Sequence, residues 1–316
     1  MQDDIVMTMR GICKYFPGVK ALEHVDFTLR RGTIHALMGE NGAGKSTLIK
    51  VLTGVYPMDK GEIRIDGVDG PVVIHSPQEA QSFGISTVYQ EITLCPNLTV
   101  AENMFIGRSQ CRGVNWKAME KRAGELLENL SIPARPKQQL GSCSLAVQQM
   151  VAIARAVDTE CKVLILDEPT SSLDDKEVEM LFRLMRDLKA RGVGIIFVTH
   201  FLEQVYAVSD QITVLRNGEL VGEYLVKELP QVQLVEKMIG KDIEDLAVIK
   251  RMTPLPTPTR RFSTRRRASP ALKAAPSTST SPRARSTVSP ACWAPAAARA
   301  SAPSSGPTRS RGASSR

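Results

Sequence analysis

The 316-residue sequence lacks long apolar runs, and no stretch approaches the roughly 18 consecutive apolar residues that a transmembrane helix needs. Residues 1–4 are acidic and are not followed by the apolar segment of a signal peptide, so we expect a cytosolic protein. The six cysteines are scattered, without the Cys-x-x-Cys spacing of zinc sites, so free thiols are expected. These absences argue against membrane-spanning, disulfide-rich secreted and zinc-finger proteins.

Acidic residues are absent from the C-terminal part. Residues 253–316 contain eleven Arg, one Lys and no Asp or Glu, a net charge of +12. Residues 1–252 hold the other 29 basic residues and all 33 acidic ones, a net charge of −4. We therefore predict a mildly acidic globular part joined to a basic tail. The tail is mainly Pro, Ser, Ala, Arg and Thr, which predicts disorder, although its Arg content also suits a nucleic-acid-binding arm.

An eight-residue segment fits the phosphate-binding loop (P-loop) pattern G-x-x-x-x-G-K-[ST]. Its residues are Gly39, Glu40, Asn41, Gly42, Ala43, Gly44, Lys45 and Ser46. The mostly apolar residues 33–38 predict a buried strand before it, and residues 47–52 predict a helix after it. Gly42 and Gly44 can adopt backbone angles that turn successive amides inward to bind an anion at the helix start. A chance match in a Gly-rich turn is the alternative, which the flanking strand and helix disfavour.

Polar residues follow three further predicted strands. The strands are residues 85–89, 162–166 and 194–199, and the residues after them are Gln90, Asp167 with Glu168, and His200. The second run is continuously apolar, as in a parallel strand buried on both faces. Taken alone, Gln90 is typical of a surface amide and His200 of a hydrogen-bonded buried histidine. Because the carboxyl ends of parallel strands meet at one edge of a sheet, we expect these side chains to lie beside the P-loop.

This set of residues matches the needs of phosphoryl transfer. Lys45 and the loop amides would hold the phosphates. Three residues would hold Mg²⁺, namely Ser46, Asp167 (mostly through water) and Gln90. Glu168 would polarise the attacking water, and His200 would contact the γ-phosphate.

The remaining pattern predicts an antiparallel start and a mainly helical middle. Residues 5–30 indicate two short strands around a turn at Pro17 and Gly18. Further expected elements are a helix after the N-cap Thr99, a helix over 116–130, a helix over 145–157 capped by Ser144, a helix capped by Asp174, and a hairpin over 211–221 with an Asn-Gly turn.

With these motifs in this order, the sequence resembles the nucleotide-binding domain of an ATP-binding cassette (ABC) transporter. The matching motifs are the P-loop, the Gln90 loop, residues 164–170, the D-loop 171–174 and the His200 switch. The resemblance covers residues 5–240 and implies an α/β fold of the ABC type of P-loop NTPase. That fold has a mainly parallel core sheet, an N-terminal antiparallel β subdomain and a helical subdomain, here at about 91–160. The nucleotide-binding domain would span residues 1–250.

The resemblance also implies the nucleotide contacts. Phe16, rather than Tyr15, falls at the adenine-stacking position. The other contacts with the bound ATP would come from Gly39, Glu40, Asn41, Gly42, Ala43, Gly44, Lys45, Ser46 and Thr47. Ser144 belongs to the signature motif, which clamps the ATP held by an opposite cassette. The family signature is Leu-Ser-Gly-Gly-Gln, whereas residues 143–147 are Cys-Ser-Leu-Ala-Val, so the site that this motif completes is expected to be weak.

Finer similarities indicate a group within the family. Residues 16–22 and 39–50 resemble the first cassette of bacterial monosaccharide importers for ribose, galactose and galactofuranose, and residues 144–153 and 198–206 look most like the galactofuranose type. The implied protein is an ATPase that uses ATP and Mg²⁺ to power sugar import through separate membrane permease subunits. A periplasmic sugar-binding protein would deliver the sugar, and a second cassette or a homodimer would complete the ATP sites. The protein would lie peripherally on the cytoplasmic face of the bacterial inner membrane and bind no nucleic acid.

The tail has a further interpretation. Importers of this group carry two fused cassettes, whereas the resemblance stops near residues 247–252. Residues 291–296, back-translated and read two nucleotides later, give the codons NTG, YTG, GGC, NCC and NGC. These allow Leu-Leu-Gly-Ser-Gly, which resembles the P-loop opening of the second cassette in this group. We therefore interpret residues 251–316 as out-of-frame translation of a second cassette, with a native disordered tail and a functional basic arm as the alternatives.

Two other functions stay open at this point. A non-transport cassette ATPase acting on ribosomes or DNA has the basic tail as its support. Salt-sensitive nucleic-acid binding that disappears when residues 253–316 are deleted would favour it. A non-functional truncation product would fold without having a partner, and co-purification with a permease would distinguish the importer subunit from it.

Overall fold

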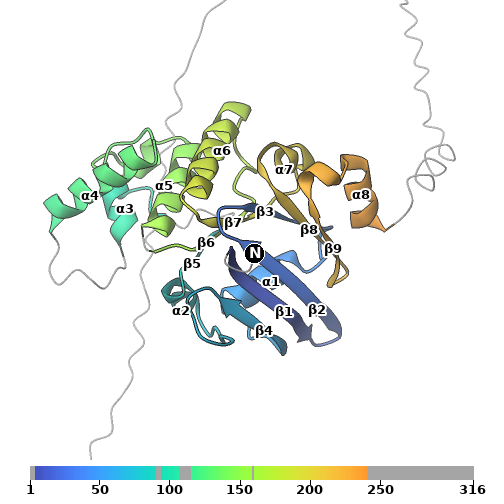
Figure 1. Cartoon of the computed structure of the whole chain (residues 1–316). Coiled ribbons are helices and arrows are strands. Elements are labelled where there is room, and N and C mark those ends of the chain that lie inside the picture. Colours follow the sequence, from blue (N-terminus) through green and yellow to red (C-terminus); the bar gives the residue numbers. More distant parts are fainter. Residues whose placement is uncertain (1–3, 90–93, 107–114, 159, 241–316) are drawn as a thin grey trace, which may run out of the picture. The chain divides into compact units, whose positions relative to one another are not determined.

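The structure, a computed structural model, describes residues 4–89, 94–106, 115–158 and 160–240. Its strands form two sheets, which Figure 1 shows together with the helices. The strands are β1 (Ile5–Phe16), β2 (Val19–Arg30), β3 (Ile34–Met38), β4 (Lys60–Ile65), β5 (Ile85–Val88), β6 (Val163–Asp167), β7 (Gly194–Val198), β8 (Gln211–Arg216) and β9 (Glu219–Leu225).

The larger sheet has the strand order β5-β6-β7-β3-β8-β9. Its first five strands in that order run parallel, and β9 pairs antiparallel with β8. The smaller sheet is antiparallel, with the order β2-β1-β4. Both predicted sheets are thus confirmed, although β1 and β2, at 12 residues each, are longer than the short strands expected. Register shifts along β1 interrupt its alternation, which hid its true length from the sequence pattern.

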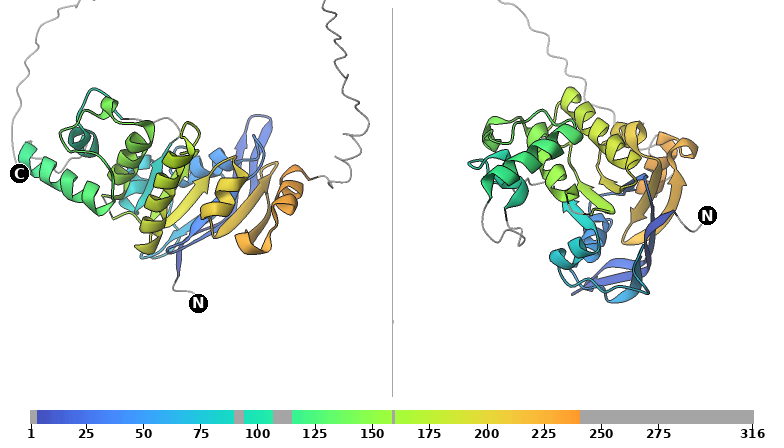
Figure 2. Two further views of the ribbon diagram at one scale, coloured as in Figure 1. Left: turned by 90° about the horizontal axis from the view of Figure 1, so that it is seen from above. Right: turned by 60° about the vertical axis from the view of Figure 1, so that its left-hand side comes forward.

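The central strands are buried on both faces, which explains their continuous apolar runs. Successive residues of β6 and β7 pack into different core clusters. The cluster that includes helices α3 to α6 receives Leu164, Leu166, Ile195 and Phe197. The cluster that includes α1 and the antiparallel sheet receives Val163, Ile165, Ile196 and Val198. Figure 1 and the right view of Figure 2 both show the antiparallel strands on the side of the central sheet away from the green helices.

Three of the described helices begin at the capping side chains predicted from the sequence. The helices are α1 (Lys45–Leu52), α2 (Pro77–Ser82), α3 (Val100–Phe105), α4 (Trp116–Asn129), α5 (Leu145–Val157), α6 (Asp175–Ala190), α7 (Leu202–Val208) and α8 (Gln231–Ile239), with short 3₁₀ turns at Leu140–Ser142 and Val226–Glu228. The N-cap side chains of Thr99, Ser144 and Asp174 each accept a hydrogen bond from the backbone three residues on. Among the described residues, no helix is long and apolar enough to cross a bilayer.

Three short or late helices escaped prediction from sequence: α2, α7 and α8. Helices α2 and α7 have only six and seven residues, too few for a helical hydrophobic period to appear. Between residues 94 and 158 the described elements are helical, but the boundaries of a separate helical subdomain at 91–160 stay a prediction. The predicted tail, 251–316, lies outside the described residues.

His35, in β3, is a fully buried titratable group of the core. Its Nε2 lies 2.7 Å from the Thr213 hydroxyl oxygen, and its ring is 4.7 Å, centroid to centroid, from that of Phe27. Burial lowers the pKa of His35 to about 4, and the negative charge of Asp210 opposes this shift only in part. The fold therefore holds this imidazole neutral.

This burial makes the free energy of unfolding depend on pH. The unfolded chain binds a proton on His35 near its ordinary pKa of 6.5, whereas the folded chain does so only near about 4. The neutral, buried His35 contributes its full stabilisation at pH values above 6.5. Up to about 3 kcal/mol of the free energy of unfolding is lost as the pH falls from 6.5 to about 4. Urea denaturation of the wild type and of His35→Leu at several pH values measures it as the pH-dependent part of their difference. The exposed His75→Gln is the control, and a difference that does not change with pH would contradict the expectation.

Candidate functional site: the P-loop and the carboxyl ends of the parallel strands

The P-loop connects β3 to α1 and has an unusual backbone. Gly39, Gly42 and Gly44 have φ angles of 151°, 84° and 104°, all positive. Side chains other than hydrogen strongly disfavour such angles, so the glycine spacing of the motif reflects a backbone requirement. The loop closes on itself through a hydrogen bond from the Ala43 amide to the Glu40 carbonyl, 3.1 Å.

Segments distant in sequence hold this loop in place. The Gly218 amide, in the turn between β8 and β9, donates to the Ala43 carbonyl at 3.1 Å, and the Gly218 carbonyl accepts from the Glu23 amide at 2.8 Å. Asn217 and Gly218 have φ angles of 53° and 82°, which confirms the predicted Asn-Gly turn. A Cβ atom on Gly44 would lie 2.8 Å from the Ala21 carbonyl oxygen. The β1–β2 sheet and the β8–β9 turn thus support the loop from outside.

Lys45 begins α1 and is partly buried. Its ammonium donates to the carbonyl oxygens of Gly39, at 2.7 Å, and Glu40, at 3.0 Å. Burial lowers the pKa of Lys45, while the charges of Glu168 and Asp167 act in the opposite direction. Ser46 follows with an exposed side chain, and Thr47 is half-buried. The loop therefore brings the Lys45 ammonium and the exposed Ser46 hydroxyl together at the start of α1.

The sheet places the acidic residues and His200 beside this loop. Val198 of β7 pairs with Asp167 of β6 on one side and with Leu37 of β3 on the other. The three strands therefore end at the same level, and the residues that follow them lie at one edge of the sheet. The predicted convergence of the P-loop, Asp167 with Glu168, and His200 follows from this register. Gln90, predicted to follow β5 at the same edge, lies outside the described residues.

Two carboxylates share this edge at an electrostatic cost. Burial raises the pKa of Asp167, and the neighbouring charge of Glu168 raises it further, while Lys45 and Lys50 act against the shift. Glu168 has a φ of 48°, which a non-glycine residue adopts at a cost of about 1–2 kcal/mol. Its amide donates to the Val198 carbonyl at 2.9 Å, which ties the strained residue to β7.

His200 faces Glu168 from the end of β7. Its Nδ1 lies 3.4 Å from the Glu168 Oε1, and its ring is 4.0 Å, centroid to centroid, from that of Phe201. His200 has an exposed side chain. The imidazole and the carboxylate can both form hydrogen bonds with a group bound at this edge.

Phe16 lies in a cluster of aromatic and charged groups at the end of β1. Tyr56 meets its ring edge-on at 5.3 Å, and the Lys14 ammonium is 5.5 Å from its centroid. The Asp59 carboxylate accepts a hydrogen bond from the Tyr15 amide at 2.6 Å and forms an ion pair with the Lys14 ammonium at 3.2 Å. Both interactions lower the pKa of the Asp59 carboxyl group. This cluster holds a half-buried aromatic ring at the position predicted for adenine stacking.

Ser144 stands apart from these groups, at the exposed start of α5. Its hydroxyl accepts from the Val147 amide of the same helix at 3.4 Å. Leu145 is 47% exposed beside it, whereas Ala146 and Val147 are buried. This hydrogen bond belongs to the helix cap, and any role of Ser144 toward a nucleotide stays a prediction.

Several contacts that build the site carried no sequence signal. Tyr56, Lys14 and Asp59 support Phe16 from other segments, and Gly218 supports the P-loop. The Asn-Gly turn was predicted as a hairpin turn, but its contact with the P-loop depends on the pairing of β8 with β3. Pairing of that kind cannot be read from one strand alone.

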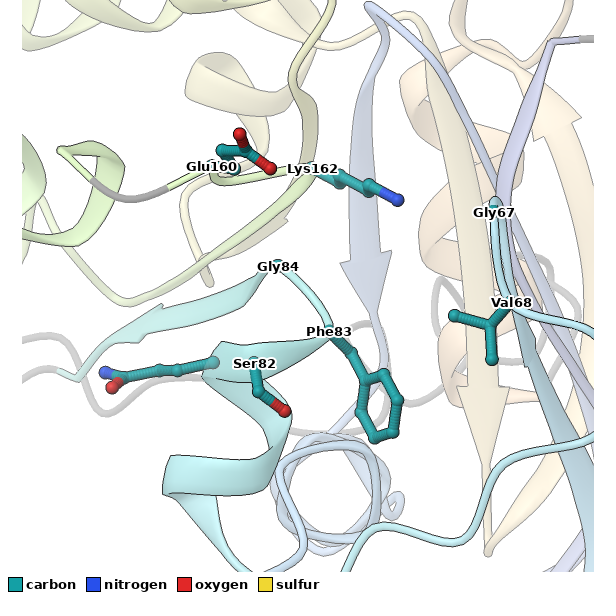
Figure 3. A pocket seen from close by; sticks show the side chains of 8 residues that line it. Gly67, Val68, Ser82, Phe83, Gly84, Glu160 and Lys162 are labelled. Atoms are coloured by element: carbon teal, nitrogen blue, oxygen red, sulfur yellow. The ribbon is translucent and has the colours of Figure 1, made fainter.

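A separate pocket of about 350 Å³ lies at the opposite ends of the strands. It is lined by Gly67, Val68, Gln81, Ser82, Phe83, Gly84, Glu160 and Lys162. Figure 3 shows these side chains coming from the turn after β4 and from the segments that lead into β5 and β6. Since these are the amino ends of both strands, the pocket is distinct from the P-loop edge.

Comparison with known proteins agrees with this geometry. Residues 22–171 match the family described as ABC transporter. The chain therefore contains an ABC transporter domain. An ATP-binding cassette of an ABC transporter solved in an ADP conformation has a TM-score of 0.65 and 27% identity, covering 75% of this chain and 99% of that chain. A nucleotide-free cassette from an ABC transporter has a TM-score of 0.64 and 25% identity, with coverages of 76% and 96%.

Curated relatives of the cassette are named as sugar import proteins. The galactofuranose transporter ATP-binding protein YtfR of Escherichia coli K12 is 54% identical over 249 residues, covering 78% of this chain and 49% of that protein. The fructose import ATP-binding protein FruK of Bifidobacterium longum is 49% identical over 247 residues, with coverages of 77% and 48%. The ribose import ATP-binding protein RbsA 1 of Rubrobacter xylanophilus is 49% identical over 251 residues, with coverages of 79% and 50%. The chain spans about half the length of these relatives.

The P-loop glycines give a matched test of the packing around the cassette's loop. A Cβ on Gly39 would overlap the Leu215 carbonyl oxygen, whereas a Cβ on Gly42 would meet no atom within 4 Å. Both residues have positive φ, so each Gly→Ala change is expected to cost about 1–2 kcal/mol of unfolding free energy. Gly39→Ala is expected to lose about 1–3 kcal/mol more because of the clash. Urea denaturation without nucleotide compares the two, and equal losses would contradict the packing described here.

Proposed function

We propose that this cassette binds and hydrolyses ATP. The observation that carries the proposal is the common level of the ends of β6, β7 and β3, which brings Glu168, His200 and the P-loop to one edge. Polyphosphate binding needs inward-facing amides, a cation and a helix start. The P-loop places Lys45 at the start of α1, and its positive-φ glycines allow the loop amides to turn inward. In this proposal Gly39 to Thr47 hold the phosphates and Phe16 stacks on adenine.

The residues at this edge suit Mg²⁺ as the cofactor. Ser46 contributes an exposed hydroxyl, and Asp167 a half-buried carboxylate whose pKa is raised by burial and by Glu168. A divalent cation would favour the ionised form of Asp167 and so offset the repulsion between the two acids. Oxygen ligands of this kind are what Mg²⁺ prefers. When bound, Mg²⁺ supplies positive charge to the phosphate oxygens, and Gln90 is the further ligand predicted from sequence.

Glu168 and His200 would carry the chemistry beside the γ-phosphate. Glu168 would orient and polarise the attacking water, and Gln90 would assist in that step. His200, at 3.4 Å from the Glu168 carboxylate, would donate toward the γ-phosphate oxygen and keep the carboxylate in place. Both functions use the positions that the ends of β6 and β7 impose.

The relatives support sugar import as the use of this ATPase. YtfR, FruK and RbsA 1 are named for the import of galactofuranose, fructose and ribose. We infer that the cassette powers import of a monosaccharide through separate permease subunits, with a periplasmic sugar-binding protein upstream. It would lie on the cytoplasmic face of the bacterial inner membrane and work with a second cassette or a second copy of itself.

Ser144 would contact the ATP held by that opposite cassette. Leu145, 47% exposed, stands where the family signature has glycine, and its side chain would occupy space at the same surface. We therefore expect the isolated chain to bind ATP but to hydrolyse it poorly. Robust turnover by the monomer would contradict this expectation.

Two substitutions separate binding from hydrolysis. Lys45→Ala removes the cation at the loop and is expected to weaken Mg²⁺-ATP binding about 10- to 100-fold. Glu168→Gln should leave that affinity within about 2-fold while reducing any turnover about 100-fold or more, as expected for loss of a general base. Calorimetric titration and phosphate release measure the two quantities. The exposed Lys117→Ala and Glu128→Gln are the controls, and unchanged ATP affinity in Lys45→Ala would refute the assigned binding site.

The boundaries of the cassette are also a proposal. We infer a nucleotide-binding domain over residues 1–250, with its helical subdomain at about 91–160, and out-of-frame translation of a second cassette over 251–316. Sequencing the gene across the codons for residues 245–300 tests the frameshift. We expect an open shifted frame that encodes a second P-loop; an early stop codon in that frame would exclude the frameshift.

A further inference from the structure

Gln204, on α7, joins the two strand ends that carry Glu168 and His200. Its side-chain oxygen accepts the hydroxyl of Thr170 at 2.6 Å and the hydroxyl of Thr199 at 3.3 Å. Thr170 follows Glu168 by two residues, and Thr199 immediately precedes His200. One amide oxygen therefore bridges the loop after β6 and the end of β7.

The backbone amide of Phe201 determines the direction of the hydrogen bond between Thr199 and Gln204. The Phe201 amide donates to the Thr199 hydroxyl oxygen at 3.2 Å, so the Thr199 proton is free to be donated to Gln204. The hydroxyl groups of Thr170 and Thr199 both need an acceptor, because their side chains are only 3% and 2% exposed. Gln204 supplies the two lone pairs of one oxygen, which an apolar side chain could not do.

The bridge is held from a rigid element. Val205, next to Gln204, is fully buried in the core cluster that includes Ala36 and Met38 of β3. Helix α7 is therefore packed on the strand that leads into the P-loop. In turn, Glu168 has positive φ and needs its surroundings to keep it there. The Thr170 bond restrains the chain just beyond this strained residue.

We propose that Gln204 is a positioning residue that fixes the Glu168 carboxylate relative to the His200 imidazole, by bridging Thr170 and Thr199. It touches neither reacting group and acts through the two threonines. The expected effect on turnover rests on the proposed ATPase function. The expected effect on the Glu168–His200 arrangement rests on geometry alone.

Substitution of Gln204 tests this with a conservative rescue. Gln204→Met removes the acceptor at similar size, and Gln204→Glu keeps an acceptor oxygen. We expect Gln204→Met to lower kcat for ATP about 10-fold with ATP affinity within about 2-fold, because misplacement affects turnover and not phosphate binding. Gln204→Glu should recover most of that loss. Gln233→Met, an exposed residue of α8, is the matched control. Equal kcat in Gln204→Met and the wild type, or no recovery in Gln204→Glu, would overturn the proposal.

A second measurement works even if the wild-type chain shows no turnover. The chain has four histidines, so the His200 imidazole signal can be assigned by NMR from single His substitutions. At fixed pH, Gln204→Met should move the His200 signal, because the Glu168–His200 separation of 3.4 Å changes. It should leave that of His75 in place, and Gln204→Glu should restore the His200 position. An unmoved His200 signal refutes the positioning role, whereas a moved signal in a chain that does not bind Mg²⁺-ATP refutes only the ATPase proposal.

Discussion

The register between β6, β7 and β3 is the constraint on which the site depends. Val198 pairs with Asp167 and with Leu37, so three chain segments leave the sheet at one level. Core packing fixes that register, because alternate residues of these strands pack into different clusters. A one-residue slip would exchange the two faces of a strand. The polar residues at the edge are therefore positioned by apolar residues that never approach a ligand.

The P-loop depends on support from outside its own motif. Its glycines allow the positive φ angles of the loop. The hydrogen bond from the Gly218 amide and the close packing of Ala21 against Gly44 hold the loop in that shape. These contacts come from the β8–β9 turn and from β2, which both lie outside the motif. The short P-loop motif thus relies on both sheets for its geometry.

Electrostatics gives this edge its chemical character. Asp167 and Glu168 lie next to each other in a partly buried place, with Lys45 and Lys50 as compensating charges. Glu168 also keeps a strained backbone angle, and neighbouring groups on β7 and α7 restrain it. Like charges and backbone strain held together in this way are typical of functional sites and are costly elsewhere. The arrangement suits a polyphosphate that arrives with a divalent cation.

Local chemistry was readable from the sequence because it acts over a few residues. The glycine spacing of the P-loop, the N-caps Thr99, Ser144 and Asp174, the Asn-Gly turn and the buried strands all follow from local backbone preferences and short periodicities. Motif order also carried the family resemblance. What sequence patterns could not supply was pairing between distant segments, since a strand's own residues do not name its neighbour. The tertiary structure alone decided that Tyr56 meets Phe16, that Gly218 supports Ala43, and that Gln204 bridges Thr170 and Thr199. Those contacts arise from sheet order and helix packing, which are properties of the whole core.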